Sequence, residues 1–168
     1  MSDAVLIRPF EPDEWALYRD LRLRALTDSP NAFAKTHAEE KDRTPDEWSR
    51  RLMESATSPS WLCLIATLGD KAIGLSFAHC VADTENVAHL YSMWVDPVVR
   101  GLGIGRRLVE AVLDWSRERK ARRVVLQVTE GNQAAVSLYQ RAGFRPTDEL
   151  TPLRAGSTLF ARMMVFEL

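Results

Sequence analysis

Alternating glycines stand between an apolar segment that ends at Val95 and an amphipathic segment. The turn reads Arg100-Gly101-Leu102-Gly103-Ile104-Gly105-Arg106. A helix that begins there leaves its first backbone N–H groups without intrahelical acceptors, at the positive end of the helix dipole. Because glycine has no Cβ, an anion can approach these N–H groups closely, and Arg100 adds a positive charge. The pattern predicts a site for a phosphate or a diphosphate.

The spacing of the glycines excludes two familiar phosphate sites. A dinucleotide-binding turn requires G-x-G-x-x-G, whereas the third glycine here comes one residue early. A P-loop ends in Gly-Lys-Ser or Gly-Lys-Thr, whereas Gly105 is followed by Arg106 and Arg107. A tight turn that binds no ligand would use the same residues. The prediction of a phosphate site therefore needs support from a second motif.

That second motif follows in residues 132–144, which read NQAAVSLYQRAGF. Together the two motifs resemble the GNAT superfamily of N-acetyltransferases, which transfer an acyl group from acetyl-CoA to an amine. One match is R-x-x-G-x-G and the other is N-x-x-A-x-x-L-Y-x-x-x-G-F. The matching residues are Arg100, Gly103, Gly105, Asn132, Ala135, Leu138, Tyr139, Gly143 and Phe144. The resemblance covers roughly residues 60–168, with a weaker similarity in the first 50.

The resemblance implies acetyl-CoA as the acyl donor and no metal. It places pantetheine between two central strands that separate at one end, bonded by backbone groups near Trp94 and Val95. In the family, the asparagine that matches Asn132 contacts the cofactor or holds the turn, and Asn132 would also cap a helix. The expected cofactor-binding residues are Trp94, Val95, Arg100, Gly101, Leu102, Gly103, Ile104, Gly105, Arg106, Asn132 and Tyr139.

Tyr139 and His89 are the expected catalytic residues. The resemblance assigns Tyr139 as the proton donor to the departing CoA thiolate, although an amphipathic aromatic at the edge of the core is the alternative. Many family members carry glutamate six residues before the valine that matches Val95, and this chain has His89 there. Histidine accepts protons near pH 7, so His89 would act as the base. The alternative is that His89 is a structural residue of the strand.

Other side chains near these positions keep alternative interpretations open. Strict strand alternation places His89, Tyr91 and Met93 on one face. His79 is a weaker candidate for the base, and His37 lies in an early loop where it would be solvated.

The acceptor pocket is expected from the early helices and their loop, about residues 26–43, together with residues 148–157. The segment 26–33 resembles one found in many family members of unassigned substrate. The acidic residues Glu39, Glu40 and Asp42 would attract a cationic amine, or they would simply be solvated. A deep enclosed pocket would favour a small molecule, and an open groove would favour a peptide.

The composition indicates a soluble globular domain spanning residues 1–168, with 46% hydrophobic and 27% charged residues. A net charge of −1 gives no reason to expect nucleic acid or an anionic membrane as a partner. The apolar run 61–68 is too short to cross a bilayer. Cys63 and Cys80 lack CxxC spacing, which argues against a metal site or a disulfide scaffold and favours the reducing cytoplasm. The oligomeric state, including a homodimer, stays open.

The elements that must position these residues follow from periodicity and cap signals. Strands are expected at 5–8, 61–67, 72–82, 87–95, 124–128 and 159–166, and helices at 12–27, 44–53, 103–120 and 132–142. The order strand, glycine turn, helix and strand predicts a β-α-β crossover and hence one parallel pair, whereas the earlier hairpin is antiparallel. The fold class is α/β (α+β), with a mixed, mostly antiparallel sheet and helices on both faces. This agrees with the GNAT fold that the resemblance implies.

These observations predict an acetyl-CoA-dependent N-acetyltransferase that transfers the acetyl group directly to a primary amine of a small molecule. A peptide or protein N-acetyltransferase is the alternative within the same class. A non-catalytic acyl-CoA-binding regulatory module is the alternative outside it, because His89 replaces the usual glutamate.

Overall fold

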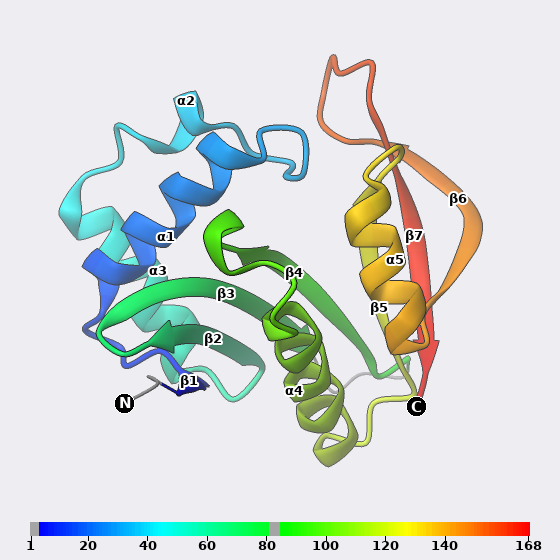
Figure 1. The fold of residues 1–168 in the computed structure, drawn as a ribbon, viewed down its shortest axis with the longest axis horizontal. Helices are drawn as coiled ribbons and strands as arrows, with labels where there is room; N and C mark the ends of the chain where they lie inside the picture. Colours follow the sequence, from blue (N-terminus) through cyan, green and yellow to red (C-terminus); the bar gives the residue numbers. More distant parts are fainter. Residues whose placement is uncertain (1–3, 81–84) are drawn as a thin grey trace.

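A single sheet of seven strands runs through the molecule in the order β1-β2-β3-β4-β5-β7-β6 (Figure 1). The computed structural model describes residues 4–80 and 85–168. The strands are β1 Val5–Pro9, β2 Trp61–Leu68, β3 Lys71–Cys80, β4 Val87–Val95, β5 Arg123–Thr129, β6 Arg145–Pro152 and β7 Phe160–Glu167. Every neighbouring pair is antiparallel except β4–β5, as predicted. The last two positions of the strand expected at 72–82 lie outside the described residues.

The parallel strands β4 and β5 pair only at their beginnings. Their register runs from Val87 opposite Arg123 to His89 opposite Val125, and beyond this point the two strands diverge (Figure 1). A sheet that opens in this way leaves backbone groups on both inner edges without ladder partners. The predicted splayed pair is therefore confirmed, and it lies at the carboxyl end of β4, directly before the glycine turn.

Helices cover both faces of the sheet. The helices α1 Trp15–Asp28, α2 His37–Glu40 and α3 Pro45–Thr57 belong to one side, and α4 Ile104–Glu118 and α5 Gln133–Ala142 belong to the other. The helix α3 begins at a capping box, in which Thr44 and Glu47 exchange bonds of 3.2 and 2.6 Å. None of the helices in the described ranges is both long and apolar enough to cross a membrane.

A bulge interrupts the alternation of β4. Leu75 lies opposite Trp94, but Phe77 lies opposite Tyr91, so β4 carries one extra residue between these pairs. The backbone of Ser92 accommodates the extra residue by adopting a left-handed conformation, with a φ of 53°. As a result, Tyr91 faces the side of α1 and α3, and Met93 faces α4. The prediction that His89, Tyr91 and Met93 share one face is therefore wrong for Met93.

Two elements escaped prediction, the short helix α2 and the edge strand β6. The box that caps α2 is Thr36 with Glu39, a signal present in the sequence within a segment expected to be a loop or broken helix. The strand β6 contains Pro146 and lacks apolar alternation. At the edge of a sheet a proline costs no hydrogen bond between strands, because its nitrogen can face away from the neighbouring strand. The position of β6 at the sheet edge, and not its sequence pattern, therefore explains why these residues form a strand.

Candidate active site

The glycine turn leads directly into α4. Gly101 and Gly103 have φ values of 85° and 76°, which side-chain-bearing residues rarely adopt. A Cβ added at either glycine would meet no atom within 4 Å, so the space beside the turn is open. These two glycines are required by backbone conformation, and they leave room for a ligand.

Backbone N–H groups of the turn lack acceptors among the residues that the structure describes. Within residues 4–80 and 85–168, nothing accepts a hydrogen bond from the N–H groups of residues 101–106. The next N–H group, that of Arg107, bonds the Gly103 carbonyl at 3.1 Å and begins the helix ladder. A run of free donors at a helix N-terminus is suited to bind the oxygens of a diphosphate.

Gly105 has a different role from the other two glycines of the turn. A Cβ there would lie 3.2 Å from Leu138 Cδ2 and 3.4 Å from Met93 Cε. Leu138 belongs to α5, so the missing side chain allows α4 and α5 to approach closely. Gly105 therefore allows close packing of the two helices beneath the turn. The sequence predicted a different role for it, which was to let an anion approach the backbone.

A cavity of about 460 Å³ extends from the turn along the end of β4 to α5 and to residues 29–33. It is lined by Ser29, Ala32, Phe33, Met93, Trp94, Val95, Val99, Arg100, Gly101, Gly103, Ile104, Gly105, Arg106, Asn132, Ala134, Ala135, Leu138, Tyr139 and Arg141. Every predicted cofactor-binding residue is among them except Leu102, whose side chain is 67% exposed. A shallower hollow of about 630 Å³ lies along α1 and contains none of the predicted catalytic residues.

A polar cluster joins the end of α1 to the end of β4 at the rim of this cavity. The carboxylate of Asp28 accepts bonds from the Trp94 indole at 2.9 Å and from Arg100 at 2.5 Å. Arg100 also donates to the Val95 carbonyl at 2.9 Å. Burial opposes ionisation of Asp28, but the bonds from Trp94, Ser29 and Arg100 hold its pKa below the usual range. The side chain of Arg100 therefore binds the protein, and its charge stands beside the turn.

The backbone of Val95 faces the opening. The N–H of Asp96 donates to the Ile73 carbonyl at 2.8 Å, on the β3 side. Because successive residues of a strand alternate the direction of their backbone groups, Val95 directs its own groups toward the unpaired edge. Of the two residues predicted to bond pantetheine, Val95 has the suitable orientation. Trp94 pairs with Leu75 in β3, and its side chain packs with the core beneath α1.

Tyr139 lines the cavity from α5, one helical turn before its end. Its ring packs edge-on against Phe144 with the centroids 5.9 Å apart. Burial raises the pKa of its hydroxyl well above the ordinary value, so the group stays protonated. Within the part of the chain that the structure describes, the hydroxyl makes no hydrogen bond. The site therefore contains a neutral O–H donor at the inner wall of the cavity.

His89 occupies the last position at which β4 pairs with β5. Its ring stacks on Tyr91 with a centroid separation of 5.9 Å, on the sheet face that α1 and α3 partly cover. His79 lies directly opposite in β3, and its ring packs against that of Trp61 with the centroids 4.4 Å apart and the planes tilted by 37°. His89 is not among the cavity-lining residues, because it stands where the opening begins. The structure thus places the two candidate catalytic residues, Tyr139 and His89, on opposite faces of the split sheet.

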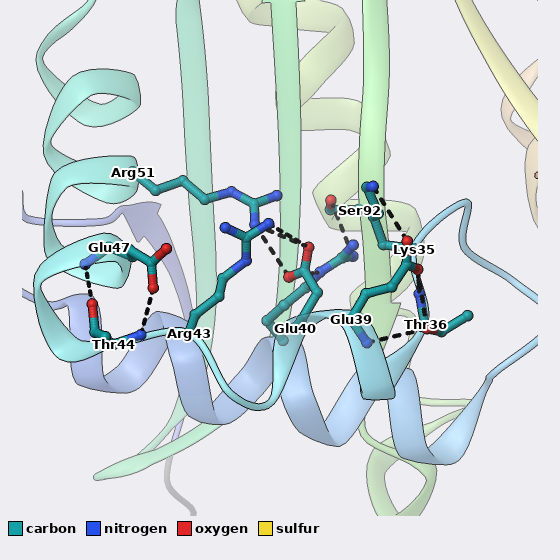
Figure 2. A network of polar contacts seen from close by, with 10 residues as sticks. Lys35, Thr36, Glu39, Glu40, Arg43, Thr44, Glu47, Arg51 and Ser92 are labelled. Atoms are coloured by element: carbon teal, nitrogen blue, oxygen red, sulfur yellow. Dashed lines mark hydrogen bonds and ion pairs between the residues drawn. The ribbon is translucent and has the colours of Figure 1, made fainter.

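The acidic residues of the early loop serve the protein itself (Figure 2). Glu40 is fully buried, with Arg51 at 3.0 Å, Arg22 at 3.5 Å and Arg43 at 3.7 Å. Glu39 caps α2 through Thr36. Glu40 therefore cannot attract a cationic acceptor, and this part of the prediction is wrong. Only the packing of three helices could reveal that a carboxylate in an apparently solvated charge run is buried.

The Arg22 guanidinium extends this network to the active site. It donates to Ser92 Oγ at 3.4 Å, at the bulge of β4, and its carbon lies 5.0 Å from the centroid of the Phe33 ring. Burial lowers the pKa of Arg22, and the charge of Glu40 opposes that shift. No sequence signal marks Arg22, because its sequence context is that of an ordinary helix arginine.

Known proteins share both the sequence pattern and the architecture. A mycothiol acetyltransferase of Geodermatophilus obscurus is 36% identical over 123 residues, which cover 71% of this chain and 39% of the relative. The chain spans less than half the length of the curated relatives it matches. A GNAT acetyltransferase from Streptococcus pneumoniae superposes with a TM-score of 0.82 at 23% identity, covering 98% of this chain and 100% of that structure.

Another solved structure, an N-acetyltransferase from Thermoplasma acidophilum in complex with coenzyme A, superposes with a TM-score of 0.75 at 16% identity. The superposition covers 98% of this chain and 99% of the Thermoplasma acidophilum chain. The family model described as the acetyltransferase (GNAT) family matches residues 17–144, which include both motifs and the splayed strands. The chain therefore belongs to the GNAT family of acetyltransferases.

Proposed function

We propose that this chain transfers the acetyl group of acetyl-CoA directly to the primary amine of a small molecule. The observation that carries the proposal is the run of unbonded N–H groups in residues 101–106, at the mouth of a cavity that reaches the protonated Tyr139. A diphosphate-binding turn and a buried proton donor are the two features that a CoA thioester requires.

The residues around the cavity fit acetyl-CoA along its length. The free N–H groups would hold the diphosphate, and Arg141 adds positive charge at the rim, where Arg100 and Arg106 are paired with Asp28 and Glu110. The unpaired edge of Val95 would bond the amide groups of pantetheine. Gly101 and Gly103 leave open space where a Cβ would otherwise stand, so the main chain can approach the ligand.

Direct transfer needs a neutral amine. An alkylamine with a pKa of about 10.4 is protonated at pH 7, and its deprotonation costs roughly 4–5 kcal/mol at about 1.36 kcal/mol per pKa unit. We assign His89 as the base that takes this proton, directly or through water. The amine nitrogen then attacks the thioester carbonyl carbon, and the carbon–sulfur bond breaks.

Tyr139 completes the transfer on the other side of the sheet. As the carbon–sulfur bond breaks, its electron pair passes to sulfur, and Tyr139 donates the hydroxyl proton that makes CoA a thiol. Solvent then returns a proton to Tyr139 and removes one from His89. With the two residues on opposite faces, an amine would enter from the His89 side while CoA leaves from the Tyr139 side.

An acyl-enzyme route has little support from the cysteines. Cys63 and Cys80 are both buried, and burial raises the pKa of the Cys63 thiol to about 12. A thiol that is almost wholly protonated is a poor nucleophile. The absence of a bridge between these cysteines also supports our proposal of a cytoplasmic protein. A single domain over residues 1–168 and a homodimer remain predictions.

The relatives favour a small acceptor over a protein. Several matches carry the name mycothiol acetyltransferase, which refers to a low-molecular-weight acceptor. Acetylation of a peptide amine is the second candidate, and a regulatory acyl-CoA-binding module is the third.

Release of CoA thiol from acetyl-CoA, measured across a panel of small amines and peptides, tests these functions. We expect turnover with at least one small primary amine and a ternary-complex kinetic pattern. Turnover with peptides alone would move the assignment to the second candidate. Tight CoA binding in calorimetry without turnover on any amine would favour the regulatory module, and no heat on addition of CoA would overturn the whole proposal.

A further inference from the structure

A serine stands at the bulge of β4 in a backbone conformation that favours glycine. Ser92 has a φ of 53°, in the left-handed region that residues with a Cβ rarely adopt. Bulges that use this conformation commonly place a glycine there, because glycine adopts it without strain. A side-chain-bearing residue keeps such a conformation only where its surroundings hold it, and such residues concentrate at functional sites.

The buried guanidinium of Arg22 is the group that contacts the Ser92 side chain. Its Nη1 donates to Ser92 Oγ at 3.4 Å, and no other described residue offers this nitrogen an acceptor (Figure 2). Only 4% of Arg22 is exposed, so water cannot easily replace the serine hydroxyl. A buried donor that loses its acceptor carries a free-energy cost, and this cost opposes displacement of the Ser92 side chain.

Glu40 fixes the other side of the guanidinium. Its carboxylate lies 3.5 Å from Arg22 Nε and is itself fully buried. Arg51, which belongs to α3, lies 3.0 Å from the same carboxylate. The position of Arg22 is therefore set by the packing of the helices and not by the strand that it contacts.

The bulge decides which way the next three residues of β4 face. Met93, Trp94 and Val95 all line the cavity. With the extra residue, Met93 lies toward α4, and Trp94 lies toward α1, where its indole donates to Asp28 at 2.9 Å. Without it, strict alternation would exchange these faces and would also reverse the backbone groups of Val95. The conformation of Ser92 therefore determines which groups the end of β4 presents to the cavity.

We propose that Arg22 is a positioning residue of the acetyl-transfer site, which holds Ser92 in its left-handed conformation and thereby orients the Val95 edge toward CoA. The inference rests on the proposed function, because it takes that edge to be where pantetheine binds. Arg22 touches neither substrate in this role and acts through the Ser92 hydroxyl. A residue that adopts the left-handed conformation by itself should therefore make Arg22 dispensable for CoA binding.

A double-mutant cycle tests this role. Arg22→Gln should weaken CoA binding about tenfold, which equals about 1.4 kcal/mol, because Ser92 is no longer held. When Ser92→Gly is also present, the same change at Arg22 should leave the CoA dissociation constant nearly unaltered, because glycine needs no holding. Calorimetry with CoA measures all four proteins of the cycle, and thermal melting confirms that each is folded.

Arg51→Gln is the matched control. Arg51 bonds the same carboxylate of Glu40, and in the described part of the chain it makes no bond to β4. The control variant should lower the melting temperature and leave the CoA affinity unchanged, with and without Ser92→Gly.

Ser92→Ala tests the same bond if Arg22→Gln does not fold. It removes the hydroxyl and keeps a Cβ, so the residue at the bulge loses its partner and stays strained. It should bind CoA about tenfold less tightly than the wild type. Wild-type affinity in Ser92→Ala would overturn the role of the hydroxyl.

Hydrogen exchange provides a readout that needs no ligand. The Asp96 amide bonds the Ile73 carbonyl at 2.8 Å, beyond the bulge. The Phe10 amide, bonded to β2 at 2.8 Å, is an internal reference outside the split. The exchange rate of Asp96 relative to Phe10 should rise at least tenfold in Arg22→Gln and stay unchanged in Arg51→Gln.

Equal losses of CoA affinity from Arg22→Gln with and without Ser92→Gly would overturn the proposal, because Arg22 would then not act through Ser92. An equal loss in Arg51→Gln would overturn it as well, since damage to the buried network would explain the loss. If the wild-type chain binds no CoA, the proposed function fails. The exchange ratio then decides whether Arg22 holds the bulge, with a tenfold rise in support and an unchanged ratio against it.

Discussion

The two sides of the split between β4 and β5 use their polar groups in opposite ways. On the cofactor side, the N–H groups of residues 101–106 have no acceptors among the described residues. On the acceptor side, the Pro30 and Asn31 carbonyls and the Glu40 carboxylate are all bonded to other parts of the chain. A site that binds through its main chain presents unbonded donors, whereas bonds to distant parts of the chain fix the path of a segment that forms neither helix nor strand.

The largest expected effect comes from breaking the acceptor side at Glu40. Glu40→Gln leaves Arg22 buried without a compensating charge, and loss of one partner of a buried ion pair costs about 3–5 kcal/mol. Urea unfolding should show this loss. Glu39→Gln, on the exposed side of α2, should cost much less. Equal losses for both variants would contradict the importance of the buried network.

Tyr139→Phe removes the hydroxyl that is proposed to protonate the departing CoA thiolate. Removal of a general acid lowers kcat by about 10²-fold, whereas the affinity for CoA should stay nearly unchanged because the diphosphate site is untouched. Since burial raises the pKa of Tyr139, wild-type activity should show no loss from tyrosine ionisation up to pH 10. Loss of CoA binding in calorimetry would mean that the hydroxyl is misassigned.

His89→Gln tests whether a base acts on the acceptor side. We expect kcat/KM for the amine to fall by about 10²-fold or somewhat less, because water can partly replace a base. A base accepts a proton only in its neutral form, so the wild-type pH–rate profile should have a limb on the acidic side. The variant should lose this limb. An unchanged pH–rate profile would remove His89 from the base role.

Gly103→Ala disturbs the cofactor side alone. A side chain in the left-handed region costs about 1–2 kcal/mol, so the affinity for CoA should weaken about 5–30-fold as the turn relaxes. The matched control is Gly69→Ala in the β2–β3 hairpin, which also has a positive φ, of 57°. It should lower the melting temperature and leave the CoA dissociation constant unchanged. The comparison fails if both variants bind CoA equally well.

Asp28→Asn gives the smallest effect, at the junction of the two sides. Because the folded protein holds the pKa of Asp28 below its ordinary value of 3.8, the carboxylate adds stability above that pH and loses it as pH falls through the lower folded value. The wild type should therefore melt above the variant at pH 7, and the difference should shrink below about pH 3.8. A difference in melting temperature that does not depend on pH would mean that the shape of the Asp28 side chain, and not its charge, contributes to stability.

The fold and the cofactor side were largely predictable because their signals are local. Apolar periodicity indicated most strands and helices, and the crossover rule gave the one parallel pair. The conformations of Gly101 and Gly103 follow from a turn that enters a helix, so the unbonded N–H groups could be inferred before any contact was known. Asn132 caps α5 as predicted, through the Ala135 N–H at 3.3 Å.

The acceptor side was much less predictable, since its partners are distant in sequence. The bulge at Ser92 reversed the side that Met93 faces, and no periodicity signals a single inserted residue. The edge strand β6 depends on pairing with β7. Glu40 looks like one member of a solvated run until α1 and α3 bring Arg22 and Arg51 against it.

The sequence by itself determined the glycine turn and the beginning of α4, because φ angles and helix beginnings depend on neighbouring residues. Only the tertiary structure decided what holds the segment after α1. Thr129 binds the Asn31 carbonyl across 98 positions, and Arg100 binds Asp28 across 72. Contacts of that range depend on how the whole sheet is assembled, and no local pattern encodes them.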